Sequence, residues 1–182
     1  MNRPSDPAGI RKAIWTELTA AVTDRGHPWR NVVLATSSSD NAAAVRMVIL
    51  REAQAEQWQL VFYTDQRSAK CQQIKTLPKG ELLFWHPVLK WQLRAAVDYQ
   101  LLTEGPVIDN LWQQIAATPA ANDYLAAAAP GDSLLSDAVA ISETPSFAVI
   151  IATVRYFDWL ALSKSVHKRA VLSADDFQWC AP

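Results

Sequence analysis

Cations and hydroxyl groups gather in one stretch of the chain, residues 46–70. Arg46 and Arg51 bracket a short apolar run, and a second apolar run ends beside a group of cationic and hydroxyl side chains. That group consists of Thr64, Arg67, Ser68 and Lys70. It stands where a strand is expected to give way to a helix, and a helix start offers free backbone N–H groups and the positive end of the helix dipole. The stretch therefore predicts a phosphate-binding site.

Short apolar runs rich in β-branched and aromatic residues surround this stretch and predict strands. The expected strands are 31–36, 43–51, 58–64, 81–85, 91–103, 147–162, 166–172 and 177–180. A turn is expected at 37–41 and a polar loop at 131–145. Because many strands lie in local hairpins with helices between them, we expect an antiparallel barrel plus helices and not a parallel sheet. The sequence contains no GxGxxG or GxxxxGK[ST] motif, so it gives no support for a Rossmann or P-loop fold.

The first helix is expected to begin at Asp6-Pro7, an N-cap followed by proline at the first helical position, and to stop at Gly26 and Pro28. Its apolar residues recur at helical spacing: Ile10, Ile14, Trp15, Leu18 and Val22. Further helices are expected at 67–77, with Ile74 and Leu77 on the buried side, and at 106–116 and 119–128. We expect one domain, 1–182, that is mainly β with helices (α+β), with an N-terminal helix within 1–26 and a helical insert at 104–130.

Composition narrows the class of protein. Of 182 residues, 50% are hydrophobic and 19% are charged, and the net charge is −1. This balance argues against a general nucleic-acid or membrane-surface binder. Cys71 and Cys180 form neither a metal pattern nor a disulfide framework, and no signal peptide or bilayer-spanning run is evident. We therefore expect a cytoplasmic protein without a metal site.

An ordered set of residues resembles the pyridoxamine 5′-phosphate oxidase family of FMN-binding split-barrel flavoproteins. The set comprises Arg46 to Arg51 (Arg-Met-Val-Ile-Leu-Arg), Phe62-Tyr63-Thr64 with Ser68 and Lys70, Gln92, and a tail in which Trp159 precedes Arg169 by ten residues with His167 between them. The resemblance covers roughly residues 30–182. It implies a Greek-key split β-barrel that forms a homodimer, with FMN at the subunit interface.

The resemblance also implies a role for each matching residue. Arg46 and Lys70 would pair with the FMN phosphate, as charge-assisted bonds favour, with Ser68 and Arg67 at the same helix end. Ala69 stands where the family usually has an arginine. The remaining implied contacts are Met47, Val48, Ile49 and Arg51 at the flavin ring, Tyr63 and Thr64 at the ribityl phosphate, and Gln92, Trp159 and Arg169 from the second subunit. Either Arg51 or Arg169 could stabilise the reduced flavin at its N1–C2 edge.

Two departures bear on the substrate. The family's oxidase holds its substrate phosphate with an arginine and a serine in the helical insert, whereas residues 116–123 contain no cation here. Ser165 stands where another substrate-facing arginine is expected. Losing two cations should cost several kcal/mol, at about 1.5–3 kcal/mol per charged hydrogen bond. We therefore expect a divergent, oxidase-related branch and little oxidation of pyridoxamine 5′-phosphate.

Two classes of function follow. The first is an FMN-dependent oxidoreductase acting on an unidentified small organic substrate, which His167 and Arg169 could orient; oxygen and a nicotinamide both stay open as electron partners. The second is a non-catalytic flavin- or haem-binding protein on the same barrel, for which His86 and His167 are the candidate haem ligands.

Several of these residues also have ordinary explanations. Lys70 could be a solvated charge, Ser68 only a helix cap, and Gln92 a side chain that bonds backbone. His86 before Pro87 is expected in a turn, and His27 outside any site. Asp175-Asp176 is expected to be a solvated turn, because two adjacent carboxylates without histidine make a poor metal site.

Overall fold

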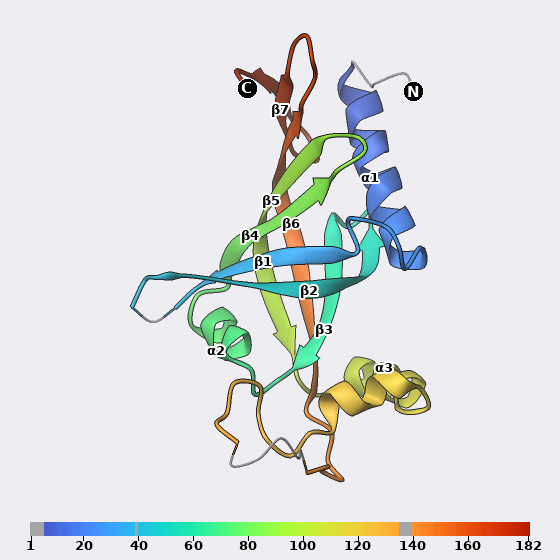
Figure 1. Ribbon diagram of the computed structural model, residues 1–182, viewed down its shortest axis with the longest axis vertical. Coiled ribbons are helices and arrows are strands. Elements are labelled where there is room, and N and C mark those ends of the chain that lie inside the picture. The colour runs from blue at the N-terminus through green and yellow to red at the C-terminus, as the bar shows by residue number, and fades with distance from the viewer. Residues whose placement is uncertain (1–5, 39, 135–139) are drawn as a thin grey trace.

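The computed structural model describes residues 6–38, 40–134 and 140–182 (Figure 1). Along the chain the elements are α1 (Pro7–Thr23), β1 (Asn31–Ser37), β2 (Ala43–Gln54), β3 (Gln59–Asp65), α2 (Ala69–Thr76), β4 (Lys79–His86), β5 (Trp91–Leu102), α3 (Pro106–Ala116), the 3₁₀ helix η1 (Pro119–Tyr124), β6 (Phe147–Ala161), β7 (Lys168–Leu172) and β8 (Phe177–Cys180). The expected turn at 37–41 and loop at 131–145 lie partly outside the described residues.

Six antiparallel strands close into a barrel. Their order is β3-β2-β1-β4-β5-β6, and β3 pairs with β6 to close the ring. Strand β4 lies beside β1, on the side away from β2, so strands β1 to β4 form a Greek key. The antiparallel barrel expected from the sequence is confirmed.

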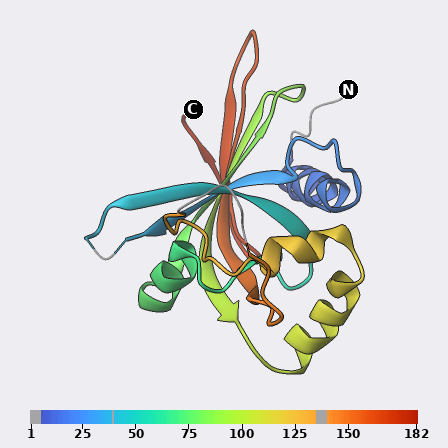
Figure 2. The ribbon, with the colours of Figure 1, turned by 60° about the horizontal axis from the view of Figure 1, so that its bottom comes forward.

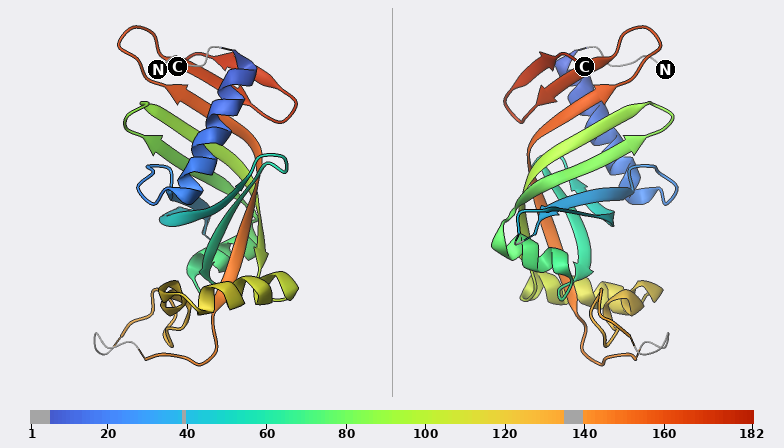
Figure 3. Two further views of the ribbon diagram at one scale, coloured as in Figure 1. Left: turned by 90° about the vertical axis from the view of Figure 1, so that its right-hand side faces the viewer. Right: turned by 60° about the vertical axis from the view of Figure 1, so that its left-hand side comes forward.

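Strand β6 is the longest strand and connects the barrel to its extension. Its first half, up to Thr153, pairs with β3, and its last residues, from Phe157, pair with β7. Strand β8 then pairs with β7, so these two strands continue the sheet beyond the barrel (Figure 3). Residues in β7 therefore lie at one end of the molecule, far from α2 and the insert at the other end (Figure 1).

Helix α1 lies along the barrel and supplies part of its core (Figure 3). Its N-cap is Asp6, whose Oδ1 accepts a hydrogen bond of 2.9 Å from the Gly9 N–H, as the sequence predicted. The helix ends at Thr23, before Gly26. Its buried residues are Ile10, Ile14, Trp15, Leu18 and Ala21, which pack with barrel residues such as Trp29, Phe62, Phe84 and Phe157.

The two helical regions at the other end differ from expectation. Helix α2 runs from Ala69 to Thr76; Ile74 is buried as predicted, but Leu77 is 41% exposed. Leu77 is the C-cap with extended backbone, so it has left the helical face. In the insert α3 is confirmed, whereas the predicted helix 119–128 is only a 3₁₀ helix, followed by a bridge between Ala126 and Ile141. Figure 2 shows α2 and the insert at the same end of the barrel.

A second apolar cluster fastens the insert to the barrel. It consists of Val61, Ile108, Tyr124, Phe147 and Val149. No helix in the described ranges is long and apolar enough to cross a membrane.

Candidate functional site

Arg46 connects the barrel to α2. It lies on β2 opposite Leu34 of β1. Its Nη1 donates to Thr36 Oγ1 at 2.7 Å and to the Ala44 carbonyl at 2.9 Å, and its Nη2 donates to Gln73 Oε1 on α2 at 2.8 Å. The guanidinium is therefore held in place by neutral oxygens from three elements.

Lys70 lies at the start of α2, beside the end of β3. Its Nζ donates to Thr64 Oγ1 at 2.8 Å and to Ser68 Oγ at 2.9 Å. Ser68 is the N-cap residue, but its hydroxyl donates to the Asp65 carbonyl at 2.8 Å and does not cap a helical N–H. None of the hydrogen bonds among the described residues uses the N–H groups of Ala69 and Lys70. The first turn of α2 thus keeps donors available for an acceptor.

The charges of Arg46 and Lys70 repel one another, and the more distant Asp65 carboxylate opposes the effect on Lys70 only in part. Burial lowers the pKa of Lys70, and the Arg46 charge lowers it further. Burial also lowers the pKa of Arg46. Within the part of the chain that the structure describes, no carboxylate oxygen lies within 4.0 Å of either cation. Two half-buried cations beside a helix start form an anion site.

Arg67 stands next to Ser68, but its guanidinium is bonded elsewhere, and its role beside the phosphate stays a prediction. Its Nε and Nη2 donate to the two carboxylate oxygens of Asp65 at 3.1 and 2.7 Å. Its Nη1 and Nη2 also donate to the carbonyls of Ala126, Ala127 and Ala128. With these bonds the guanidinium fastens the chain after η1 to the end of β3.

The residues predicted to contact the flavin ring divide between two faces of β2. Met47 and Ile49 point outward and are exposed, whereas the Val48 side chain points into the core; the flavin contacts of all three stay predictions. A β-bulge between Leu50 and Glu52 interrupts the pairing with β3 at Arg51. Bulges re-aim a side chain, and the Arg51 guanidinium carbon lies 5.5 Å from the centre of the Tyr63 ring.

Arg51 and Tyr63 face a cavity of about 510 Å³ beside the insert. Two further arginines line it, Arg25 and Arg30, from the segment between α1 and β1. The insert contributes Ile115, Thr118, Pro119, Ala120 and Tyr124. None of the three arginines has a carboxylate oxygen within 4.0 Å among the described residues.

Two polar groups that line this cavity, Arg51 Nε and the Tyr63 hydroxyl, are partly or fully shielded from water. The Arg51 Nε is buried and has no hydrogen-bond partner in the described part of the chain. Burial raises the pKa of Tyr63 to about 12, and Glu52 contributes to the shift. The cavity therefore combines uncompensated positive charge with tyrosine rings, which suits a planar anion.

A continuous outward face crosses the barrel from β2 to β7. Across the sheet, Met47 pairs with Val33, Val33 with Leu83, Leu83 with Arg94, and Arg94 with Asp158. One row along, Gln92 lies between Trp85 and Leu160, and Leu160 is opposite Arg169. We call this surface the outer face. Its apolar part contains Val45, Met47, Ile49, Leu83 and Trp85, all exposed.

Arg169 and Gln92, which were expected to meet a flavin from the second subunit, both lie on the outer face. Arg169 is bound by Asp158, with Nε to Oδ1 at 2.9 Å and Nη2 to Oδ2 at 2.7 Å. Asp158 also accepts from Arg94, which in turn pairs with Glu81. Gln92 lines a hollow of about 220 Å³ on this face.

Trp159 points into the barrel core and not to the outer face, and its flavin contact from the second subunit stays a prediction. Its side chain is only 1% exposed and packs edge-on against Trp91, with ring centres 5.3 Å apart. Successive residues of a strand point to opposite sides, so Asp158 and Leu160, its neighbours on β6, take the outward positions.

His167 lies in the loop before β7 and is exposed. Its Nδ1 accepts from the Ser163 N–H at 3.0 Å, which leaves Nε2 as a donor. His86, the other predicted candidate for a haem ligand, is buried at the end of β4 and lies against Glu17 and His27. Of the two, His167 alone is exposed, but its Nε2 carries the hydrogen in this arrangement and would have to lose it to bind a haem iron.

Comparison with known proteins identifies the family. The model of the family described as pyridoxamine 5′-phosphate oxidase, FMN-binding domain, matches residues 12–103. The chain belongs to this family. The matched segment contains most of α1 and strands β1 to β5, together with the anion site at Arg46 and Lys70. A comparison with curated proteins finds no match.

Solved structures share the fold over the whole chain. A pyridoxamine 5′-phosphate oxidase-related, FMN-binding protein from Nostoc punctiforme is 22% identical, with a TM-score of 0.73 over 99% of this chain and 100% of its own. PhzG from Burkholderia lata, solved with tetrahydrophenazine-1-carboxylic acid, is 19% identical, with a TM-score of 0.73 over 100% and 95%. ChuZ from Campylobacter jejuni is 13% identical, with a TM-score of 0.63 over 98% and 65%. The barrel is therefore the split barrel of this family.

Three residues in these regions were missed by sequence reasoning. Gln73, which holds Arg46, lies on the exposed-looking side of a short helix, so no periodicity marks it. Arg25 and Arg30 follow the first helix in a segment that looks like a linker. They become notable only when the fold brings them to the insert.

Proposed function

We propose that this chain is a homodimeric FMN-binding oxidoreductase whose substrate is a small planar molecule with an anionic group, and that residues 1–182 form one FMN-binding domain. The observation that carries the proposal is the anion site. Arg46 and Lys70 lack a carboxylate partner within the described residues and lie beside the free N–H groups of α2. Membership of an FMN-binding family names the phosphate of FMN as the anion to expect there.

When bound, FMN would supply the hydride chemistry of its ring, and the protein would bind and orient. Arg46, Lys70, Ser68 and Thr64 would hold the phosphate. Met47 and Ile49 would cover the ring with their exposed aliphatic side chains. Arg51 is the better choice for the cation at the ring edge, because Asp158 already balances the charge of Arg169.

The outer face supports a homodimer. Exposed Val45, Met47 and Trp85 are typical of a surface that another chain covers. The phosphate site and the tail residues lie toward opposite ends of one chain (Figure 1). A flavin that touches both would lie between two chains, with Gln92, His167 and Arg169 supplied by the second.

The cavity beside the insert supports an anionic substrate. The insert itself has no cation at 116–123, but Arg25, Arg30 and Arg51 reach the same space from the barrel side. These arginines would take the place of the cations that the family's oxidase has in its insert. The positive charge would then be kept, but it would meet the substrate from a different side. PhzG, of the same fold, was solved with tetrahydrophenazine-1-carboxylic acid. We favour a carboxylate-bearing aromatic substrate over pyridoxamine 5′-phosphate.

Purified protein tests the proposal. We expect a yellow dimer that releases FMN on denaturation and whose flavin spectrum is perturbed by planar aromatic carboxylic acids. Arg25→Met and Arg30→Met should weaken that perturbation while leaving FMN bound. Protein that stays colourless and cannot be loaded with FMN would contradict the cofactor assignment.

A non-catalytic flavin carrier is the alternative. It predicts a flavin that stays oxidised with every organic reductant and nicotinamide tried, although the acids still bind. Turnover with any such compound would instead support the oxidoreductase. A coupled assay for pyridoxal phosphate should show little product.

A further inference from the structure

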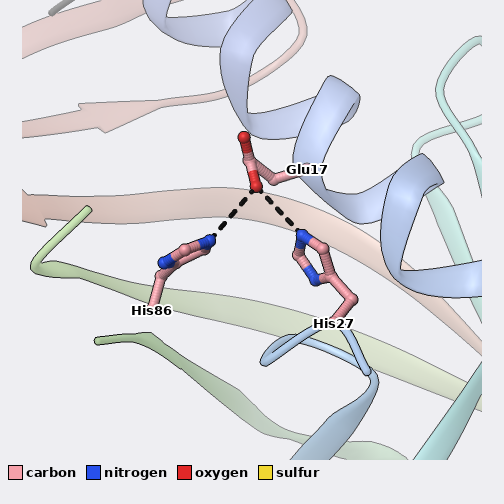
Figure 4. Close-up of side chains that lie close together, drawn as sticks. All are labelled: Glu17, His27 and His86. Carbon is pink, nitrogen blue, oxygen red and sulfur yellow. Dashed lines mark hydrogen bonds and ion pairs between the residues drawn. The ribbon is translucent and has the colours of Figure 1, made fainter. Parts of the chain in front are cut away.

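Three side chains from separate segments meet outside the FMN and substrate regions. Glu17 comes from α1, His27 from the segment between α1 and β1, and His86 from the end of β4 (Figure 4). Glu17 Oε2 lies 3.0 Å from His27 Nε2 and 3.5 Å from His86 Nε2. All three side chains are largely buried, and the two imidazole rings are 5.5 Å apart, edge to face.

Two histidines and a glutamate are suitable ligands for a transition metal, but the hydrogen bonds argue otherwise. His27 Nδ1 accepts from the Trp29 N–H at 3.1 Å, and His86 Nδ1 accepts from the Leu89 N–H at 3.2 Å. A neutral imidazole has one donor and one acceptor nitrogen, so both Nε2 atoms carry the hydrogen. His27 Nε2 donates to Glu17 at 3.0 Å, and His86 Nε2 lies 3.5 Å from the same oxygen. A metal would need those Nε2 lone pairs, and histidines that bind metals normally donate their other N–H.

The same bonds make the cluster sensitive to protons. A protonated imidazole carries hydrogen on both nitrogens. Its Nδ1–H would then face the backbone N–H of Trp29 or Leu89, so that two donors oppose each other. We propose that Glu17, His27 and His86 form a proton-sensitive latch that fastens α1 and the following segment to the end of β4 at neutral pH and opens in acid.

Burial and the neighbouring charges determine whether acid raises or lowers the stability of the folded protein. Burial lowers the pKa of His86; Glu17 opposes the shift, and His27 adds to it. Both imidazole rings also lie edge-on to the uncharged ring of Trp29. The unfolded chain therefore takes up the proton at higher pH than the folded one. The contribution of His86 to stability is therefore fully present above the unfolded histidine pKa of about 6.5 and is lost as the pH falls below it.

Opening would disturb the segment that carries Arg25 and Arg30. His27 lies between them in sequence, and both line the substrate cavity. This consequence for anion binding rests on the proposed function, whereas the latch itself does not.

Asparagine substitutions test the latch. Asparagine at 27 and 86 keeps a side-chain oxygen near the Nδ1 position, so it can still accept from Trp29 and Leu89, but it does not titrate. We expect the melting temperature of the full-length wild type to fall, from about pH 7.5 to about pH 5.5, by roughly 2–4 °C more than that of the His27→Asn/His86→Asn variant. His167→Asn is the matched control, because it removes the third histidine of the chain and should keep the wild-type pH dependence.

Amide exchange gives a local measurement. At about pH 5.5 the Trp29 and Leu89 amides should exchange faster in the wild type than in the double variant at the same pH. The latch would be overturned if the melting temperatures of the wild type and the double variant fell by the same amount over this pH range. So would a melting temperature that Zn²⁺ or Ni²⁺ raises in the wild type alone, which would show a metal site. These measurements need neither flavin nor substrate, so their failure is separate from failure of the proposed function.

Discussion

Lys70→Met is the sharpest test of the anion site. Methionine keeps the length of the side chain and removes its charge. In the proposed complex Lys70 makes a charge-assisted bond to phosphate, which is typically worth about 1.5–3 kcal/mol. The dissociation constant for FMN should therefore rise roughly 10- to 150-fold.

The same substitution should not destabilise the FMN-free protein. Lys70 is half-buried, and its ammonium is repelled by Arg46 and bonded only to two hydroxyl oxygens. Removing the charge relieves the desolvation and the repulsion, while Ser68 keeps its bond to the Asp65 carbonyl. We expect an unchanged or higher melting temperature without FMN, together with weaker FMN binding. A site that is arranged to bind a ligand commonly shows this opposition of stability and function.

Lys75→Met is the matched control, because Lys75 lies exposed in the last turn of the same helix. Fluorescence titration of FMN into FMN-free protein measures the affinity, and raised salt should weaken the wild type more than Lys70→Met. The reasoning fails if Lys70→Met binds FMN as tightly as Lys75→Met does. It also fails if Lys70→Met loses its fold, since the ammonium would then be structural.

Further substitutions test other parts of the structure. Met47→Asp places a charge in the apolar part of the outer face. Analytical ultracentrifugation should then show monomers, and flavin titration should show weaker FMN binding. A variant that stays dimeric and keeps its flavin would refute that interface. Arg67→Met should lower the melting temperature by roughly 2–4 °C through lost bonds to Asp65 and the insert, with FMN affinity within about threefold of wild type, and a larger loss of affinity would return Arg67 to the phosphate site. Gly80→Ala puts a Cβ 2.2 Å from the Ala35 carbonyl oxygen, so denaturant titration should show a free energy of unfolding lower by about 1–3 kcal/mol; unchanged stability would mean that β1 and β4 can separate at this point.

The anion site was predictable because its pieces are local. Thr64, Ser68 and Lys70 lie within seven residues at a strand-to-helix junction, and backbone geometry alone brings their side chains together. Arg46 comes earlier in the chain, on β2, where it lies opposite Leu34 in the hairpin of β1 and β2. Antiparallel neighbours joined by a tight turn are the pairing that a sequence specifies best.

Residues whose position depends on register were less predictable. Trp159 and Asp158 differ by one place on β6, and a shift of one place exchanges the core for the outer face. The sequence marks both as strand residues, but the packing of Trp91 and the pairing with Arg169 decide which one turns inward. The bulge at Arg51 is likewise invisible in the sequence, because no glycine or break in the apolar pattern marks it.

Contacts between distant segments were not predictable at all. The cavity brings residues 25 and 30 to residues 115–124, and the latch brings residue 17 to residue 86. Histidines and arginines in such segments look like solvated loop residues until the fold closes around them. The buried Arg51 Nε, which has no hydrogen-bond partner among the described residues, marks the cavity as a candidate binding site, but only the three-dimensional structure reveals it.

The arrangement of the barrel and its extension supports the proposed homodimer. The anion site lies where β3 meets α2, at the end of the barrel that carries the insert, while β7 continues the sheet beyond the other end (Figure 1). Residues on β7 could approach an anion site within the same chain only if β6, the strand that closes the barrel, came apart from β3 or β5. A second copy placed against the outer face can supply the same residues without disturbing a strand pair. The exposed apolar side chains of that face, which would otherwise favour aggregation in water, are then covered by the contact that completes the site.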